Sequence, residues 1–408
     1  MIPVYNSFDY FQNLLPLALV VGIVLHFVKH GASRRAIFIV CGVYALALVA
    51  PRLALYYVAY WLLTFVLHRA VAAAAGARSG LIVLWGAIVV LVAPLLLWKA
   101  MPEAFVVDFN VWTNQAFRAS SSRLAVLDLS FVIIAPVGLS FATFRALDLV
   151  VKTYVGLVGR LSIGRVMAYG TFAPLLVVGP IAEYKEIEAT LDARVPIDTR
   201  RATTSLLLLC SGLAKVFVGS VPLQWSIDIF QVWQYNSAWQ LLYGLVAYTW
   251  FFYLNFAGFS DLAIAAGHWF GASLHPNFNA PYLKTSPTTF WNSWHISLTS
   301  FVRRNVFVPL GGFRTERFQI ATVATMMVIA LWHGFTWASV VFGLYHSAAL
   351  LAHRRLQAAR PARPGRWRSI AKSVGVFCWF GLSLPLLTLP LGDCPSFYRA
   401  LLLGGRLA

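Results

Sequence analysis

Charged residues are scarce in this chain. Only 11% of its 408 residues are Asp, Glu, Lys or Arg and 60% are hydrophobic, whereas soluble globular proteins carry about 25% charged residues. No polar stretch is long enough to fold as a separate soluble domain, and apolar runs able to cross about 30 Å of hydrocarbon recur along the whole length. The composition excludes a soluble globular protein. It predicts an all-α polytopic membrane protein, a single domain over residues 1–408 with roughly ten or eleven transmembrane helices.

Acidic residues are scarcer than basic ones. The 14 Asp and Glu residues face 32 Lys and Arg residues, which gives a formal net charge of +18. The basic residues fall in short clusters between apolar runs, as cytoplasmic loops of membrane proteins do. We therefore interpret the charge as a determinant of topology and of contact with lipid headgroups, with no nucleic-acid partner. Attraction of an acidic carrier protein or a phosphorylated donor to the inner face is compatible with this interpretation.

Cysteine is also scarce, and the common catalytic motifs are missing. The four cysteines show no metal or redox spacing, and Cys41, Cys210 and Cys378 lie within apolar runs, which predicts packing roles. There is no HExxH, no GxSxG and no phosphate-binding Gly-rich loop, so a zinc hydrolase, a serine hydrolase and a nucleotide-driven pump all lack their expected motifs. The N-terminus lacks a positive segment before its first apolar run, which predicts a retained first span at roughly Leu14 to Val28.

One polar and aromatic stretch stands out against these apolar surroundings. Residues 277–312 hold three prolines, four asparagines, two tryptophans, a histidine and an Arg-Arg pair. The stretch is too polar for an ordinary membrane span and too aromatic for an ordinary loop. About twenty residues later, LWHGFTW places His333 where only apolar side chains would be expected. We predict that His295 and His333 lie around one buried reaction centre.

Basic clusters flank the His333 segment on both sides. The positive-inside rule places both clusters in the cytosol, so the chain enters the membrane after Arg317 and returns before Arg354. Residues 318–353 are long enough for two short spans hinged near His333-Gly334, with His333 at the deep or outward turn. A single broken span would place it nearer mid-membrane. In both arrangements we expect His333 to be largely desolvated, which disfavours its charged form and predicts a neutral imidazole.

Charged residues at membrane depth suggest a rival function. Arg145 and Asp148 are three residues apart and can pair on one helical face. Lys215 is predicted to snorkel to an interface, the alternative being a charge in a pocket. Asp261 lies in an apolar helix and needs a partner or a structural role. A proton-coupled transporter or lipid flippase would line its pathway with these residues, but no inverted repeat is visible.

Two histidines with hydroxyl and amide neighbours suit general base catalysis. A neutral imidazole takes the proton of an acceptor hydroxyl while that oxygen attacks an activated acyl group, and nearby donors steady the developing oxyanion. A thioester donor needs no metal, so we expect no bound cofactor. A membrane glycosyltransferase would need carboxylates, which are scarce near this stretch. The candidate catalytic residues are His333 and His295, and the candidate substrate-binding residues are Asn292, Trp294, Ser297, Arg303, Trp332 and Asp261.

The segment FWNSWHISLTSFVRRNVFVPLGG followed by LWHGFTW resembles the signature of the membrane-bound O-acyltransferases, in particular their bacterial cell-envelope branch. Supporting segments occur in the same order, and the resemblance covers about Pro136 to His346. It implies that His333, in the WHG motif, is the catalytic base and that His295, in the WHxS motif, is often also essential. It further implies a ring of membrane helices around a central funnel and tunnel in the bacterial cytoplasmic (inner) membrane.

The resemblance also implies the partners of the reaction. The acyl donor, a phosphopantetheine carrier protein or acyl-CoA, would enter from the cytosol. The acceptor hydroxyl, on an envelope polymer or a periplasmic relay protein, would enter from outside. Two branches compete. The opening MIPVYNSFDYF and GLYHSAALLAHRRL are similar to the D-alanyl transferase of teichoic acid D-alanylation, which we favour slightly, and VPLGG and PSFYRALLLGG to the alginate O-acetyltransferases.

Overall fold

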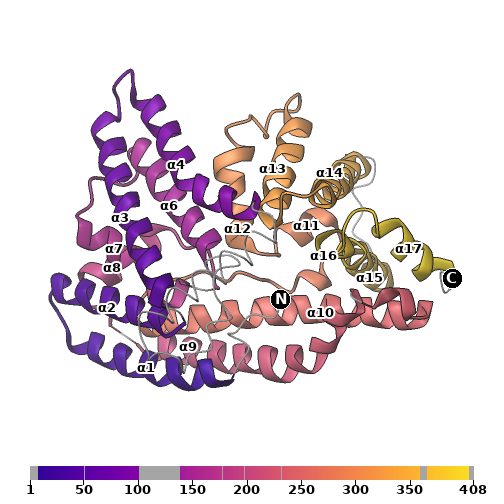
Figure 1. Cartoon of the computed structure of the whole chain (residues 1–408), viewed down its shortest axis with the longest axis horizontal. Coiled ribbons are helices and arrows are strands. Elements are labelled where there is room, and N and C mark those ends of the chain that lie inside the picture. The colour runs from indigo at the N-terminus through magenta and orange to yellow at the C-terminus, as the bar shows by residue number, and fades with distance from the viewer. Residues whose placement is uncertain are drawn as a thin grey trace, which may run out of the picture. The chain divides into compact units, whose positions relative to one another are not determined.

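The computed structural model describes residues 8–403 apart from residues 50, 101–137, 177, 197, 231 and 359–364. Every regular element in these residues is a helix, which confirms the predicted all-α class (Figure 1). Six of the described helical segments are long and apolar enough to cross a membrane, and the apolar helices Pro16–Phe27 and Phe318–His333 are shorter. The ten or eleven spans and the central funnel and tunnel stay predictions.

The chain divides into two compact units, each of which is formed by two separate segments of the sequence. The first unit comprises Met1–Leu207 and Ala263–Leu274, and the second comprises Leu208–Leu262 and His275–Ala408. Both predicted catalytic histidines belong to the second unit. The prediction of a single domain over residues 1–408 stays a prediction.

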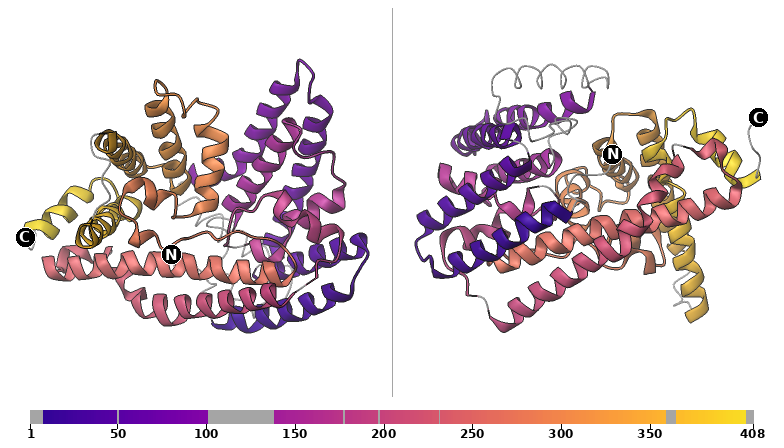
Figure 2. Two further views of the ribbon diagram at one scale, coloured as in Figure 1. Left: turned by 180° about the vertical axis from the view of Figure 1, so that it is seen from behind. Right: turned by 60° about the horizontal axis from the view of Figure 1, so that its bottom comes forward.

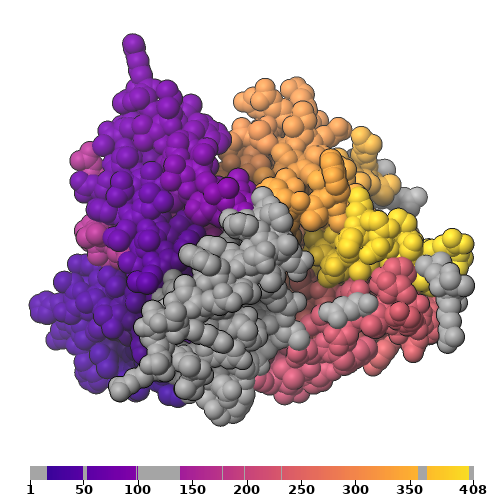
Figure 3. Space-filling model, viewed as in Figure 1, coloured from indigo at the N-terminus to yellow at the C-terminus, as the bar shows by residue number. Residues whose placement is uncertain are grey.

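The first unit begins with four long apolar helices, and α3 packs against both α2 and α4. The helix α3 opens on proline, at a position where the missing N–H is not needed. Large apolar side chains such as Ile82 and Trp85 on α4 are exposed, as expected of a face turned to lipid. Side chains of residues 51–100 cover much of the face of this unit that Figure 3 shows. The four helices are α1 (Phe8–Phe27), α2 (Gly31–Val49), α3 (Pro51–Ala74) and α4 (Gly80–Ala100).

Three shorter helices complete the core of the first unit. They are α6 (Leu139–Tyr154), α7 (Ile163–Gly170) and α8 (Tyr184–Asp192). The helix α6 packs on α3 and α4, and α7 packs on α2 and α3. Gly138 precedes α6 with φ 78° in close contact with the Leu176 carbonyl, a left-handed conformation next to backbone that only glycine fits.

Arg145 and Asp148 do not form the predicted pair. The buried Arg145 guanidinium donates to the backbone carbonyls of Tyr169 and Leu175 and lies 4.4 Å from the centre of the Tyr169 ring. Asp148 instead pairs with Lys152, one turn further along α6, at 2.9 Å, and Lys152 also pairs with Glu183. Lys152, four residues after Asp148, reaches its carboxylate. The arginine side chain instead provides hydrogen-bond donors to backbone carbonyls at the end of α7 and in the turn after it.

Two helices cross a boundary between the units: α9 (Thr199–Leu213) begins in the first unit and ends in the second, and α10 (Ala238–Trp269) begins in the second and ends in the first. They run side by side (Figure 2). A Cβ built at Gly212 would lie 2.9 Å from the Gly258 carbonyl oxygen, so both glycines are needed for this approach. The second unit then contains η3 (Ala214–Ser220), a π-helical turn, and η4 (Val221–Phe230).

The partner that Asp261 needs is Lys215. The two side chains form an ion pair across α9–η3 and α10, and the Ser211 hydroxyl donates to the same carboxylate at 2.9 Å. Lys215 thus has a half-buried carboxylate as its partner, and its predicted snorkelling to an interface stays a prediction.

The remainder of the second unit contains the helical hairpin predicted around His333. The helix α13 (Phe318–His333) ends at that histidine, and α14 (Trp337–Ala358) begins after a three-residue break, so the predicted hinge is confirmed. The two helices lie against each other (Figure 1). They are followed by α15 (Arg366–Gly381), α16 (Pro385–Thr388) and α17 (Cys394–Leu403).

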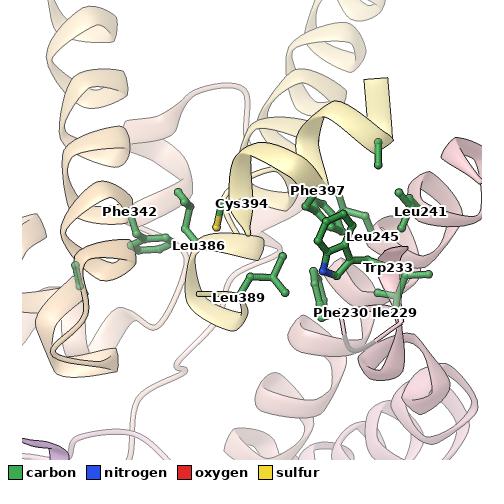
Figure 4. Packing of buried hydrophobic residues seen from close by; sticks show 12 residues of the cluster. Ile229, Phe230, Trp233, Leu241, Leu245, Phe342, Leu386, Leu389, Cys394 and Phe397 are labelled. Carbon is green, nitrogen blue, oxygen red and sulfur yellow. The ribbon is translucent and has the colours of Figure 1, made fainter. Parts of the chain in front are cut away.

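An aromatic and aliphatic cluster holds the C-terminal helices of this unit together. The rings of Phe230 and Trp233 lie 5.8 and 6.1 Å from that of Phe397 on α17. Figure 4 shows these rings in one layer with Leu241 and Leu245 of α10. The cluster reaches α14 and α16 through Phe342, Leu386 and Leu389 and includes the buried thiol of Cys394.

Candidate active site

Short helices and turns replace a span in the polar stretch that begins at Asn277. They are η6 (Pro281–Leu283), α11 (Pro287–Trp291), α12 (Ile296–Val302) and η7 (Arg303–Phe307). Ser286 caps α11 by accepting from the Thr289 N–H at 3.2 Å, and Pro287 follows at the first helical position. The prolines and caps therefore prevent one continuous helix and bring the aromatic residues into a compact group.

His295 is held in a strained backbone conformation immediately before α12. Its φ of 44° and ψ of 56° are left-handed, which costs a residue other than glycine on the order of 1 kcal/mol. Asn277 holds the strained turn, because its carbonyl oxygen accepts from the Ile296 N–H at 2.8 Å. Strain of this kind persists only where the surroundings impose it, and it is frequent at active sites.

The Asn277 amide fixes the tautomer of His295. Its Oδ1 accepts from the Ser297 backbone N–H at 3.2 Å and from the Ser297 hydroxyl at 2.9 Å, while its Nδ2 donates to the Ser260 hydroxyl at 3.0 Å. An N–H can donate only to the amide oxygen, so the orientation of the amide is determined. The same Oδ1 lies 3.2 Å from His295 Nδ1. Nδ1 must therefore carry the proton, which leaves the lone pair of neutral His295 on Nε2.

His295 is fully enclosed by rings and stays neutral. It is 2% exposed, and its ring centre lies 4.7 Å from that of Phe256 and 5.9 Å from that of Trp332. Burial, and next the charge of His333, lower the pKa of His295 from its ordinary value to about 3. An imidazole with so low a pKa is a weak base near neutral pH, where a general base works best with a pKa close to the operating pH.

His333 differs from His295 in its exposure. It is the last residue of α13, where the helix ends and the chain turns away, and its side chain is exposed. The predicted desolvation of His333 stays a prediction, because an accessible side chain at the end of an apolar helix can face lipid as well as water, whereas His295 is buried within the protein. The His333 ring lies 4.6 Å from that of Trp332, which is also the neighbour of His295. Trp332 thus lies against both imidazoles, of which His333 is exposed and His295 is buried.

The structure joins some of the predicted site residues and separates others. Ser297 shares the Asn277 oxygen with His295, Trp332 contacts both histidines, and Trp294 is buried against Phe252 and Phe380. Asn292 and Arg303 are exposed, and no described contact joins either of them to the two histidines. Asp261 is engaged by Lys215.

Two residues of the site were missed by the sequence reasoning. Asn277 lies 18 residues before His295, and turns and separate short helices lie between them, so no local periodicity could reveal the contact. His346 follows Phe342 by one helical turn on α14, and a charge on His333 acts on both His346 and His295. The three imidazoles do not form a metal site, because the described residues contain no group of three or more potential ligands placed to hold an ion.

A comparison with known families matches residues 104–385 to the sequence model described as MBOAT, membrane-bound O-acyltransferase family. A protein of Azotobacter vinelandii named "Probable alginate O-acetylase AlgI" is 30% identical over 243 residues, which are 58% of this chain and 48% of that protein. The chain thus spans about half the length of this relative.

Two other relatives carry different names. A "Peptidoglycan O-acetyltransferase" of Helicobacter pylori is 29% identical over 45% of this chain and 36% of its own length. A "Teichoic acid D-alanyltransferase" of Streptococcus thermophilus is 25% identical over 64% of this chain and 71% of its own length. The names share the transfer of an acyl group and differ in the group and in its acceptor.

Proposed function

We propose a reaction for this chain from the premise that it belongs to the membrane-bound O-acyltransferase family. The proposed reaction moves an acyl group from a thioester donor to a hydroxyl of a cell-envelope polymer or of a periplasmic relay protein. The donor is a phosphopantetheine carrier protein or acyl-CoA on the cytosolic side, and the enzyme resides in the bacterial inner membrane. The names of the relatives support an envelope acceptor.

The proposed general base is His333. Its imidazole accepts the proton of the acceptor hydroxyl while the oxygen attacks the thioester carbonyl carbon, which gives a tetrahedral oxyanion. The oxyanion then collapses, the C–S bond breaks, and the thiolate takes the proton back from the His333 imidazolium. Ester, free thiol and neutral imidazole result, so the cycle balances without a metal or an external base.

The observation that supports this assignment is the contrast between the two histidines. His333 is exposed, whereas His295 is buried and neutral with a pKa of about 3. A base must be reachable by the hydroxyl and must bind its proton at the working pH, and the exposed imidazole meets the first condition. His295 is proposed to remain neutral beside it, because a second positive charge would oppose the imidazolium that forms on His333.

The charged residues assigned to a transporter pathway have other partners. Lys215 and Asp261 neutralise each other, Asp148 pairs with Lys152, and Arg145 binds carbonyl groups. These contacts support structural roles and therefore favour the transferase over the transporter.

Acyl incorporation into envelope material tests the proposal. Cells carry the wild type, His333→Gln or His295→Gln, with His353→Gln on α14 as a matched control, and the membrane level of each variant is measured. We expect the His333→Gln variant to lose incorporation at normal abundance and the control to retain it. The acyl group recovered from wild-type material distinguishes D-alanine from acetate. Incorporation by the His333→Gln variant at the wild-type rate would overturn the base assignment.

A further inference from the structure

A third histidine of the second unit is buried deeper than either predicted one. His346 on α14 is 0% exposed. Its ring contacts Trp291 of α11 at 5.2 Å, Trp379 of α15 at 4.6 Å and Phe342 of its own helix at 4.3 Å between ring centres. It therefore packs against the helix that precedes the His295 turn and against the last turn of α15. Apolar packing alone would be served as well by phenylalanine.

The polar atoms of His346 show why a histidine is present. Its Nε2 lies 3.0 Å from the Ser383 hydroxyl oxygen. Ser383 uses its only proton to donate to the Phe380 carbonyl at 2.6 Å, so its oxygen can only accept from His346. Nε2 therefore carries the proton of the neutral ring, and the lone pair lies on Nδ1. This Nδ1 has no hydrogen-bond partner among the described residues.

A buried acceptor without a donor costs about 1–3 kcal/mol, and such groups in native proteins often have a catalytic role. Two observations connect this acceptor with His333. The Phe342 ring contacts both imidazoles, with its centre 6.3 Å from that of His333 and 4.3 Å from that of His346. A charge on His333 also acts on His346. The lone-pair side of a neutral imidazole is the negative end of its dipole, and it stabilises a neighbouring cation.

We propose, on the basis of the proposed function, that His346 is a positioning residue for His333. Phe342, packed against both rings, links the position of the His333 ring to that of His346, and the Nδ1 dipole stabilises the imidazolium that forms when the acceptor hydroxyl gives up its proton. His346 itself neither gains nor loses a proton. Ser383 keeps the tautomer correct, as the orienting group does in other hydrogen-bonded catalytic sets.

Two amide variants separate this role from packing. An asparagine amide places an oxygen near the position of Nδ1, whereas a glutamine amide reaches the position of Nε2 and keeps the hydrogen bond to Ser383. Misorientation of a catalytic group costs about a hundredfold in rate. We expect His346→Gln to lower the rate about a hundredfold and His346→Asn to stay within about tenfold of wild type. A purely structural His346 gives the opposite order, because only glutamine keeps the anchor.

The rate is measured as transfer of label from two donor probes, acetyl-CoA and a D-alanyl carrier protein, to envelope material in membranes that contain the full chain. Melting temperature in detergent reports folding, and His353→Asn on the same helix is the control. Ser383→Ala keeps every ring contact but leaves the His346 Nε2–H and the Phe380 carbonyl without this partner. It is expected to lower the rate severalfold and to lower the melting temperature moderately, since each unsatisfied buried group is destabilising. Wild-type rates in Ser383→Ala, or a higher rate in His346→Gln than in His346→Asn, would overturn the inference. If His333→Gln also retains the rate, or the wild type transfers no label, the proposed function fails instead.

Discussion

Replacing Asn277 tests the arrangement around His295 most directly. The side chain makes four hydrogen bonds, three accepted by Oδ1 from His295 and Ser297 and one donated to Ser260. Each bond contributes about 1 kcal/mol net, and a buried group left without a partner costs about 1–3 kcal/mol. Asn277→Ala is therefore expected to lower the stability of the second unit by about 2–4 kcal/mol. It also releases the left-handed turn at His295 and the Nδ1–H tautomer.

Asn277→Asp separates geometry from charge. The carboxylate keeps the oxygen that accepts three bonds, but its negative charge raises the pKa of His295 above the value of about 3 in the wild type. His295 then becomes an imidazolium beside His333 and opposes proton uptake there. We expect the Asp variant to be impaired near pH 6 and to recover as the pH rises. The wild type has no inflection from His295 in this range, because this group stays neutral well above pH 3.

The pH dependence of stability also differs between the wild type and Asn277→Asp. Burial lowers the pKa of wild-type His295 to about 3, and the unfolded chain binds a proton near pH 6.5. The contribution of neutral His295 is therefore full above about pH 6.5 and is lost as the pH falls towards 3. In Asn277→Asp the raised pKa reduces this loss.

Two measurements check these expectations, acyl incorporation and melting temperature in detergent. Both are made between about pH 5 and pH 9, a range that includes the ordinary pKa of histidine. Asn279→Ala is the matched control, because Asn279 is exposed and only its backbone N–H has a described hydrogen bond, to the Ser293 carbonyl. Wild-type activity and melting temperature in Asn277→Ala would refute the argument that this amide holds His295. A flat pH profile in Asn277→Asp would refute the argument from charge.

Three further changes probe the second unit through melting temperature in detergent. Lys215→Met leaves Asp261 without its cation. Loss of one partner of a fully buried pair costs about 3–5 kcal/mol, and we expect a smaller loss here because the two side chains are 29% and 16% exposed. Addition of Asp261→Asn should restore much of the stability, and additive losses would contradict the pairing. Gly258→Leu brings a side chain against Val216 and should prevent stable folding, so a normal melting temperature would exclude close helix contact. Ser286→Ala removes the cap of α11 and should cost about 1 kcal/mol, with no change expected if the cap is dispensable.

The sequence predicted the parts of this structure that depend on local pattern. Apolar runs predicted helices, and the Gly after His333 predicted the break between α13 and α14. The resemblance predicted the family. Contacts between distant residues could not be predicted in the same way. Nothing local distinguishes Asn277 from its neighbour Asn279, because its importance comes from a turn 18 residues later.

The sequence did not distinguish the accessibility of the two histidines within the protein. An apolar run around a histidine predicts a buried ring only if the helix continues past it, whereas α13 ends at His333 and leaves the ring exposed. His295 was predicted to belong to a buried centre, and the structure places its ring among those of Phe256, Phe278 and Trp332 with 2% of the residue exposed. This difference in accessibility underlies the two roles that we propose. The proposed base, His333, lies at a helix end, and His295, proposed to stay neutral, lies among rings that make its protonation costly.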